Sequence, residues 1–342
     1  MKRIVSLDIL KYVCILLVIN IHMELPGRYE WFLSPLLTIA VPIFFMITGF
    51  FYAQTCDAGK MGEQIKKIAI FALGANMTHI GWEIFKQMRN GKMLYGFLLE
   101  VIEPSALVNL LMFNQPVWRT SLWYINALLY VLLFVCLFQN TAGDKLHKLY
   151  PLIPILLVGN LVMGTYSSVL FHEPYLLCYS RNFLLCGLPY FLLGDALHHY
   201  SDRIDVSRKW LFAGFVVFGL VAYGEEWILE SRRCLVHRDH LLSTVFLCIC
   251  VFLLFLKNEQ FFGSKVAAGL AVLGQRYSFL IYVTHSIIIE LFYKVIPVLT
   301  ARVPQLTVLL NWGAPIIVLF CATVLSACLK KVPRKTKRKL LF

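Results

Sequence analysis

The chain has 342 residues, of which 59% are hydrophobic and only 15% are charged. With a mean hydropathy of +0.72, this composition excludes an ordinary soluble globular protein. It predicts an all-α, polytopic membrane protein built as one helical bundle in the lipid bilayer. The net charge of +13 is typical of nucleic-acid binding only in soluble proteins. Here it indicates basic loops and a basic tail on the cytoplasmic side, so no nucleic-acid partner is expected.

Ten apolar stretches have about the length that crosses a bilayer. They cover residues 4–24, 31–54, 67–86, 121–140, 149–166, 183–200, 210–228, 241–257, 267–291 and 306–329. An even number of spans places both termini on one side, and lysine and arginine are more frequent in the loops of that side, which predicts cytoplasmic termini. We therefore expect an integral membrane domain over residues 1–329 and a basic cytoplasmic tail over residues 330–342.

The first predicted span carries three ionisable residues, Asp8, Lys11 and His22. An Asp or Lys at mid-depth costs about 2.5 to 3.5 kcal/mol on insertion scales. At about 100° and 1.5 Å per residue, Lys11 and His22 share one helix face about 16 Å apart, and Asp8 lies one turn from Lys11. This stripe predicts a polar interior. An Asp8–Lys11 pair at the membrane boundary and an interfacial His22 remain open as purely structural alternatives.

Two later stretches depart from a regular span. The second span contains VPIFFMITGFF over residues 41–51, where Pro42 and Gly49 favour a kink or close helix packing. Residues 93–113 are apolar but are interrupted by two glutamates and Pro104. We expect an interfacial or re-entrant segment there, because a complete crossing would invert every later span.

Four stretches together resemble the membrane-bound acyltransferase 3 family over essentially the whole chain. They are SLDILKYVCILLVINIH, VPIFFMITGFF, RNFLLCGLPYFLLGDAL and YSFLIYVTHS. The first is similar to the family's signature of a basic residue, ten residues and a histidine, which falls here on Lys11 and His22. The chain also resembles the membrane half of membrane-bound serine racemases. No pyridoxal-phosphate domain follows the last span, so racemase chemistry is not expected.

The resemblance implies an O-acyltransferase that moves an acyl group, acetyl in many members, from cytoplasmic acyl-CoA to a hydroxyl of a cell-surface glycan or similar acceptor. It implies a multi-pass protein of a bacterial plasma membrane. Many sugar acetyltransferases of the family have a tryptophan followed by a glutamate in the fourth span. This chain has Trp123 but carries Asn126 where the acid is expected, which leaves the subfamily and the acceptor open.

Acyl transfer needs a base for the acceptor hydroxyl, donors for the developing oxyanion and cations for the CoA phosphates. His22 is the predicted general base, because its ordinary pKa lies near operating pH. Lys11 is expected to neutralise a donor phosphate or polarise the acyl carbonyl, and Asp8 to orient Lys11. Direct attack of the hydroxyl is the expected route, and an acyl-histidine intermediate remains an alternative.

Acceptor binding is assigned to polar and aromatic residues of later spans. Arg181 would hold an acidic or oxygen-rich acceptor. Either Glu225 or the adjacent Glu226 would pair with an arginine or bind sugar hydroxyls. His285 would line the polar interior, and Trp123 and Tyr124 would stack on a sugar face. The alternatives for the two charged positions are an interfacial anchor for Arg181 and a place at the water interface for the glutamate. His285 could instead be a buried core histidine, and the two aromatic residues could belong to an ordinary aromatic belt at the membrane interface.

Lys66 and Lys67 are the candidate CoA-phosphate ligands at the cytoplasmic mouth, although cationic loops are usually topology signals. The histidines show no ligand spacing with acids or cysteines, so no metal is expected. A transporter of a small polar solute, such as an amino acid, is the alternative function, because intramembrane Asp, Lys and His also suit proton-coupled transport. Consumption of acyl-CoA would distinguish the two.

Overall fold

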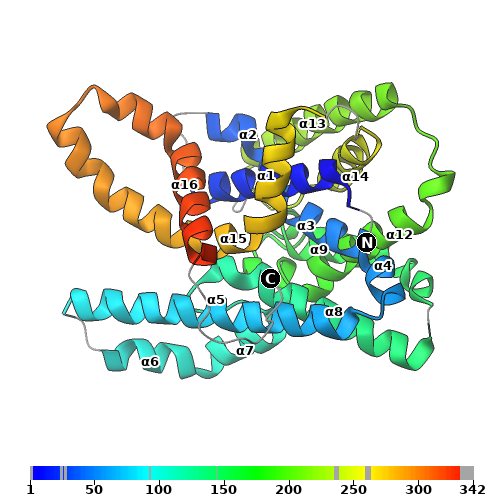
Figure 1. Cartoon of the computed structure of the whole chain (residues 1–342), viewed down its shortest axis with the longest axis horizontal. Coiled ribbons are helices and arrows are strands. Elements are labelled where there is room, and N and C mark those ends of the chain that lie inside the picture. The colour runs from blue at the N-terminus through cyan, green and yellow to red at the C-terminus, as the bar shows by residue number, and fades with distance from the viewer. Residues whose placement is uncertain are drawn as a thin grey trace.

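The computed structural model describes residues 3–23, 26, 29–91, 94–143, 145–234, 239–258 and 263–331, without the side chains of residues 29–32. The described chain is all-α, as predicted, and forms a polytopic helical bundle (Figure 1). Its helices are α1 (Val5–Ile21), α2 (Tyr29–Leu37), α3 (Ala40–Phe50), α4 (Tyr52–Asp57), α5 (Met61–Arg89), α6 (Leu94–Ile102), α7 (Pro104–Phe113), α8 (Trp123–Ala142), α9 (Leu152–Met163), α10 (Ser167–Leu170), α11 (Leu177–Ser180), α12 (Leu188–His199), α13 (Arg208–Ser231), α14 (Leu242–Lys257), α15 (Lys265–Arg302) and α16 (Leu306–Lys331).

Fewer segments than the ten predicted are long and apolar enough to cross a membrane. Six meet both conditions in the described part of the chain: Leu33–Asp57, Met61–Arg89, Thr120–Ala142, Arg208–Ser231, Lys265–Arg302 and Leu306–Lys331. The other predicted spans contain shorter helices, such as α1 with 17 residues, α14 with 16 and α9 with 12. At 1.5 Å per residue, a 12-residue helix covers only about 18 Å of a core about 30 Å thick.

Both stretches that the sequence marked as irregular are broken. The second predicted span divides into α2, α3 and α4, and Pro42 lies in the first turn of α3, where the missing N–H costs no helical hydrogen bond. The stretch around Pro104 forms α6 and α7, which are bent by 53°. The glutamate before the proline takes an extended ψ of 136°, as expected before a proline. This pair is a broken span or a re-entrant loop.

Helix α1 lies at the centre of the bundle, where α2, α3, α14, α15 and α16 contact it (Figure 1). Its closest approach is to α15 at Gly274, where an added Cβ would lie 1.9 Å from the backbone oxygen of Asp8. Only glycine fits this contact. The helix that carries Asp8, Lys11 and His22 is therefore enclosed by protein on several sides, as an intramembrane polar stripe requires.

A second close contact joins α3 to α12. A Cβ on Gly49 would lie 1.9 Å from the carbonyl oxygen of Phe191, and one on Gly194 would lie 2.0 Å from that of Met46. The prediction of close packing at Gly49 is confirmed. Phe45, Tyr52, Tyr190 and Phe191 are fully buried around these contacts, so the two motifs VPIFFMITGFF and RNFLLCGLPYFLLGDAL form one packed unit.

The C-terminal helices form a hairpin at the left of Figure 1, where α15 and α16 contact each other. Helix α16 continues to Lys331, and the Lys330 ammonium lies 5.3 Å from the Tyr277 ring centre. Most of the predicted basic tail, residues 332–342, lies outside the described residues. All ten cysteines are free thiols.

Candidate active site

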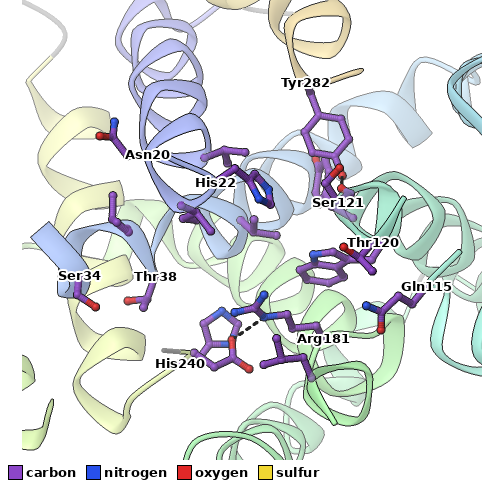
Figure 2. A pocket seen from close by; sticks show the side chains of 18 residues that line it. Asn20, His22, Ser34, Thr38, Gln115, Thr120, Ser121, Arg181, His240 and Tyr282 are labelled. Carbon is purple, nitrogen blue, oxygen red and sulfur yellow. Dashed lines mark hydrogen bonds and ion pairs between the residues drawn. The ribbon is translucent and has the colours of Figure 1, made fainter. Parts of the chain in front are cut away.

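A cavity of about 430 Å³ opens where α1 ends and where α2, α8, α11 and the start of α14 meet. Figure 2 shows His22 on one side of this cavity and Arg181 with His240 on the other. Polar side chains line much of its wall, namely Asn20, His22, Ser34, Thr38, Gln115, Thr120, Ser121, Arg181, Asp239, His240 and Tyr282. A polar cavity of this size inside a membrane bundle is the natural candidate for substrate binding.

His22 stands at the C-terminal end of α1, and its backbone N–H closes the last turn onto the oxygen of Ile19 at 3.1 Å. The next residue, Met23, is buried in the core beside α15 and α16. Core packing therefore holds the chain directly after His22. The His22 side chain is exposed and lines the cavity. This placement gives a proton acceptor direct access to a bound substrate.

Arg181 reaches the cavity because Asn182 fixes the backbone on both sides of it. The Asn182 side-chain amide donates to the oxygens of Cys178 and Tyr179 at the end of α11, and its oxygen accepts from Leu184 and Leu185 N–H groups. These last residues belong to a π-helical turn, Phe183–Gly187, before α12. π-Helical turns are rare and occur frequently at functional sites.

Both predicted aromatic residues, Trp123 and Tyr124, line the cavity. The Tyr124 ring meets the Tyr282 ring edge-on at 5.3 Å and the Phe45 ring at 4.9 Å, which holds it firmly against the wall. Asn126, at the position of the expected acid, instead accepts a hydrogen bond from Asn76 at 3.0 Å and donates to the oxygen of Asn114. The departure from the expected acid thus occurs within an amide network.

Two other predicted acceptor residues do not line the cavity. Glu225 accepts hydrogen bonds from the Tyr166 hydroxyl at 2.8 Å and the Ser243 N–H at 3.1 Å, so it joins α13 to the start of α14. The adjacent carboxylate, Glu226, lies nearer, because Ser34 of the cavity wall donates to it at 2.5 Å. His285 is buried behind the cavity, with its ring centre 5.4 Å from that of His22.

Asp8 and Lys11 form an ion pair at the other end of α1. The Lys11 ammonium lies 3.0 Å from one Asp8 oxygen, and the Arg3 guanidinium lies 2.9 Å from the other. Lys11 also lies 5.9 Å from the Phe51 ring centre, close to the point where α3 gives way to α4. Asp8 therefore contacts both cations, and neither Asp8 nor Lys11 lines the cavity that contains His22.

Lys66 and Lys67 are exposed on the first turns of α5. Helix α5 follows α4, so these lysines lie in the part of the chain that directly follows the Lys11 contact region. They do not line the cavity either. The residues predicted from sequence thus divide into a cavity group of His22, Arg181, Trp123 and Tyr124 and a cationic group at the start of α1 and α5.

Sequence analysis did not select Asp239 and His240, which line the cavity just before α14. Asp239 accepts from Ser180 Oγ at 2.6 Å and from Arg181 Nε at 3.1 Å. Burial alone would raise the pKa of Asp239, but Arg181, His240 and the Ser180 hydrogen bond lower it to about 2. A histidine directly before an apolar span was the signal that could have marked this segment.

An ion-pair network beside the cavity was also missed. Arg119 directly precedes Thr120 of the wall and contacts Glu83 and Glu290, and Lys86 lies 2.7 Å from Glu83. Trp82 donates to Glu290 at 2.8 Å. Charges from α5, α15 and the segment before α8 therefore fix the backbone at Thr120 and Ser121. None of these residues was selected from the sequence as a candidate site residue.

No group of three or more His, Cys, Asp or Glu residues within the described ranges is arranged to hold a metal ion. The described residues therefore give no structural reason to add a metal to the site.

The acyltransferase domain of the acyltransferase 3 family matches residues 4–331. The chain belongs to the acyltransferase 3 family. This membership makes the protein an acyltransferase and settles the choice between acyl transfer and transport without chemistry. Neither a search of curated proteins nor one of solved structures found a match.

Membership of the acyltransferase 3 family implies an acyl donor and an acceptor. Within the matched region, Lys11 lies in the first half of α1 and His22 directly follows the last residue of that helix. The family match covers nearly the whole described chain, so all of the helices that build the cavity belong to the acyltransferase domain.

Proposed function

We propose that this acyltransferase moves an acyl group, with acetyl as the first candidate, from cytoplasmic acyl-CoA to a hydroxyl of a cell-surface glycan or a similar acceptor. The observation that carries the proposal is the His22 side chain, which faces a polar cavity of about 430 Å³ at the end of the central helix. The bacterial plasma membrane is the proposed location, with both termini on the cytoplasmic side.

His22 acts as the general base in this proposal. The acceptor hydroxyl gives its proton to the imidazole while its oxygen attacks the thioester carbonyl. The carbon–sulfur bond then breaks, CoA leaves as a thiolate, and the imidazolium returns the proton to the sulfur. The overall change is ester formation and release of free CoA. N–H and O–H groups of the cavity wall are available to stabilise the developing oxyanion.

The donor enters from the end of α1 that carries Lys11. Asp8 holds the Lys11 ammonium at 3.0 Å, so the cation is positioned before a ligand arrives. Lys11 is about 16 Å from His22 along the helix axis, and it does not line the cavity. This favours binding of a CoA phosphate over polarisation of the reacting carbonyl. Lys66 and Lys67 add exposed positive charge for the same phosphates.

His285 has a different role from the one expected. Its Nδ1 lies 2.5 Å from the backbone oxygen of Tyr282 and therefore donates a hydrogen bond to it. Its ring packs beside the ring of His22. We place it as a positioning residue that restricts the His22 ring. Residues 94–113 are assigned a re-entrant path, because their bend at Pro104 leaves two helices of 9 and 10 residues.

Purified protein in liposomes, supplied with labelled acetyl-CoA and pooled surface glycan, tests the proposal. Wild type is expected to release free CoA and label the glycan, and His22→Ala is expected to do neither. Equal transfer by both proteins would remove His22 as the base. No transfer by wild type with any acyl-CoA or glycan fraction would contradict the proposed donor and acceptor classes.

A further inference from the structure

The cavity wall opposite His22 is built from a buried chain of hydrogen bonds that joins three separate segments. Asp239 is 4% exposed and connects Ser180 to Arg181, as described above. His240 is 5% exposed, and its Nδ1 lies 2.9 Å from Asn160 Oδ1 on α9. Groups with so little exposure and such complete bonding keep one arrangement before any substrate binds.

The hydrogen bonds of Asn160 determine which His240 nitrogen carries the proton. The Asn160 side-chain N–H donates to the oxygen of Ser180 at 2.8 Å, so its amide oxygen is the atom that faces His240. An amide oxygen only accepts, so His240 Nδ1 is the donor. In a neutral imidazole the other nitrogen, Nε2, is then an acceptor. His240 also lines the cavity, and Nε2 is the polar ring atom left for a ligand.

The charge state of the wall follows from the same contacts. Burial lowers the pKa of His240, and the nearby Arg181 lowers it further against the opposing effect of Asp239. The imidazole is therefore neutral, while the Arg181 cation is matched by the Asp239 anion at 3.1 Å. The wall offers hydrogen-bond donors from a guanidinium and one acceptor from an imidazole, and the ion pair of Arg181 with Asp239 adds no net charge to it.

We propose that Arg181, Asp239 and His240 form the acceptor subsite and select a neutral polyhydroxylated molecule over an acidic one. One acceptor hydroxyl donates to His240 Nε2, and a neighbouring oxygen accepts from Arg181. This inference rests on the proposed function, because it names the class of acceptor that the cavity takes. An acidic acceptor gains little here, since Asp239 already neutralises Arg181 and lies close enough to repel a second anion.

Calorimetric titration of the purified protein without any acyl donor tests the subsite separately from transfer. The probes are methyl glucoside and methyl galactoside, each with the methyl glycoside of its uronic acid. Wild type is expected to bind the neutral sugars about tenfold more tightly than the acids. Asp239→Asn removes the anion that lies 3.1 Å from the Arg181 guanidinium, and the preference is expected to shift by about tenfold or more toward the acids.

Asp195→Asn is the matched control, because Asp195 is also a buried carboxylate that accepts a hydrogen bond, from Tyr150 at 2.8 Å, and it does not line the cavity. It should keep the wild-type preference. His240→Leu is expected to weaken binding of the neutral sugars about tenfold. His240→Gln should lose less than about threefold, because its side-chain oxygen can accept in place of Nε2.

Equal or tighter binding of the acids by wild type would overturn the proposal, as would an Asp239→Asn shift no larger than that of Asp195→Asn. Wild type that binds none of the four sugars would also overturn it, while acyl transfer in the liposome assay would stand. Binding of the neutral sugars without transfer would instead support the subsite and count against the proposed function. If Asp239→Asn does not fold, the wild-type preference and the two His240 variants decide the question.

Discussion

The two ends of α1 differ in how their ionisable residues are held. At the Lys11 end, Asp8 is 5% exposed and pairs with both Arg3 and Lys11. At the other end, the exposed His22 side chain faces a cavity and approaches only the ring of His285 among the ring contacts of the described residues. A pre-paired cation suits a site that binds a charged group, and an accessible imidazole suits a site that moves a proton. The proposed function thus places donor binding and proton transfer about 16 Å apart on one helix.

The largest effect is expected from His22→Ala, which removes the proposed base. The turnover number should fall by about 10² to 10⁴, the range that general bases contribute. The control is His147→Ala, which removes an exposed histidine outside the cavity. Rates of CoA release by both purified variants test this. A His22→Ala protein that keeps more than about a tenth of wild-type turnover would place the base elsewhere.

Gly274→Ala should displace the part of α1 that carries Asp8 and Lys11. The new Cβ would meet the Asp8 backbone oxygen at 1.9 Å, so α1 and α15 must move apart, and overpacking of this kind costs about 1 to 3 kcal/mol. Gly269→Ala on the same helix has no atom within 4 Å of the new Cβ. It should be neutral or gain up to about 1 kcal/mol. Thermal unfolding in detergent compares them, and equal melting temperatures would contradict the close contact.

Lys11→Ala is expected to raise KM for acyl-CoA about tenfold and to leave KM for the acceptor unchanged, since the variant loses a phosphate ligand at the donor end. Lys11→Arg should keep most of the donor affinity. Steady-state kinetics with each substrate varied in turn separate the two constants. A fall in kcat with unchanged donor KM would show instead that Lys11 acts on the reacting carbonyl.

A smaller effect is expected from the exposed charges of α5. Replacing Lys66 and Lys67 together by glutamine should raise the donor KM by about threefold at low ionic strength, and the effect should shrink as salt is added, because exposed charges are screened. The control replaces Lys148, which is exposed in another loop. An effect that does not depend on salt would argue against an electrostatic role for this pair.

The smallest change is expected from pH at the cavity wall. The pKa of His240 is lowered from its ordinary value of 6.5, and that of Asp239 is about 2. Between about pH 8 and about pH 7 both groups keep their charge state, so KM for a neutral acceptor should stay constant over that range. Protonation of His240 at lower pH removes the Nε2 acceptor and should raise KM. A rise already above pH 7 would show that His240 is not held neutral.

Sequence patterns predicted that the protein is all-α and that a helix carries Asp8 and Lys11, because hydropathy and helix periodicity are local properties. They placed the Asp8–Lys11 contact correctly, since residues three apart on a helix are neighbours. They overestimated the number of full-length spans, because local breaks such as the end of α9 at Gly164 depend on tertiary contacts. The cavity residues Arg181, Trp123 and Tyr124 were found from the chemistry of their side chains.

What sequence could not reveal was pairing between distant segments. The wall of Asp239 and His240 depends on Ser180 and Asn160, which are 59 and 80 residues away in the chain. Glu225 looked like a ligand because it is an acid in an apolar span, yet its partners Tyr166 and Ser243 give it a structural setting. The fold, and not residue type, decides which of these polar groups face the cavity.

The proposal that Lys11 binds the acyl donor and His22 acts as the base is tested most directly in proteoliposomes of known orientation, with each substrate supplied on one face. Acetyl-CoA, which does not cross the bilayer, is supplied on one face and the glycan acceptor on the other. We predict CoA release and acceptor labelling only when acetyl-CoA is on the face of the Lys11 end and the acceptor on the opposite face. Transfer with both substrates confined to the His22 side would contradict the account.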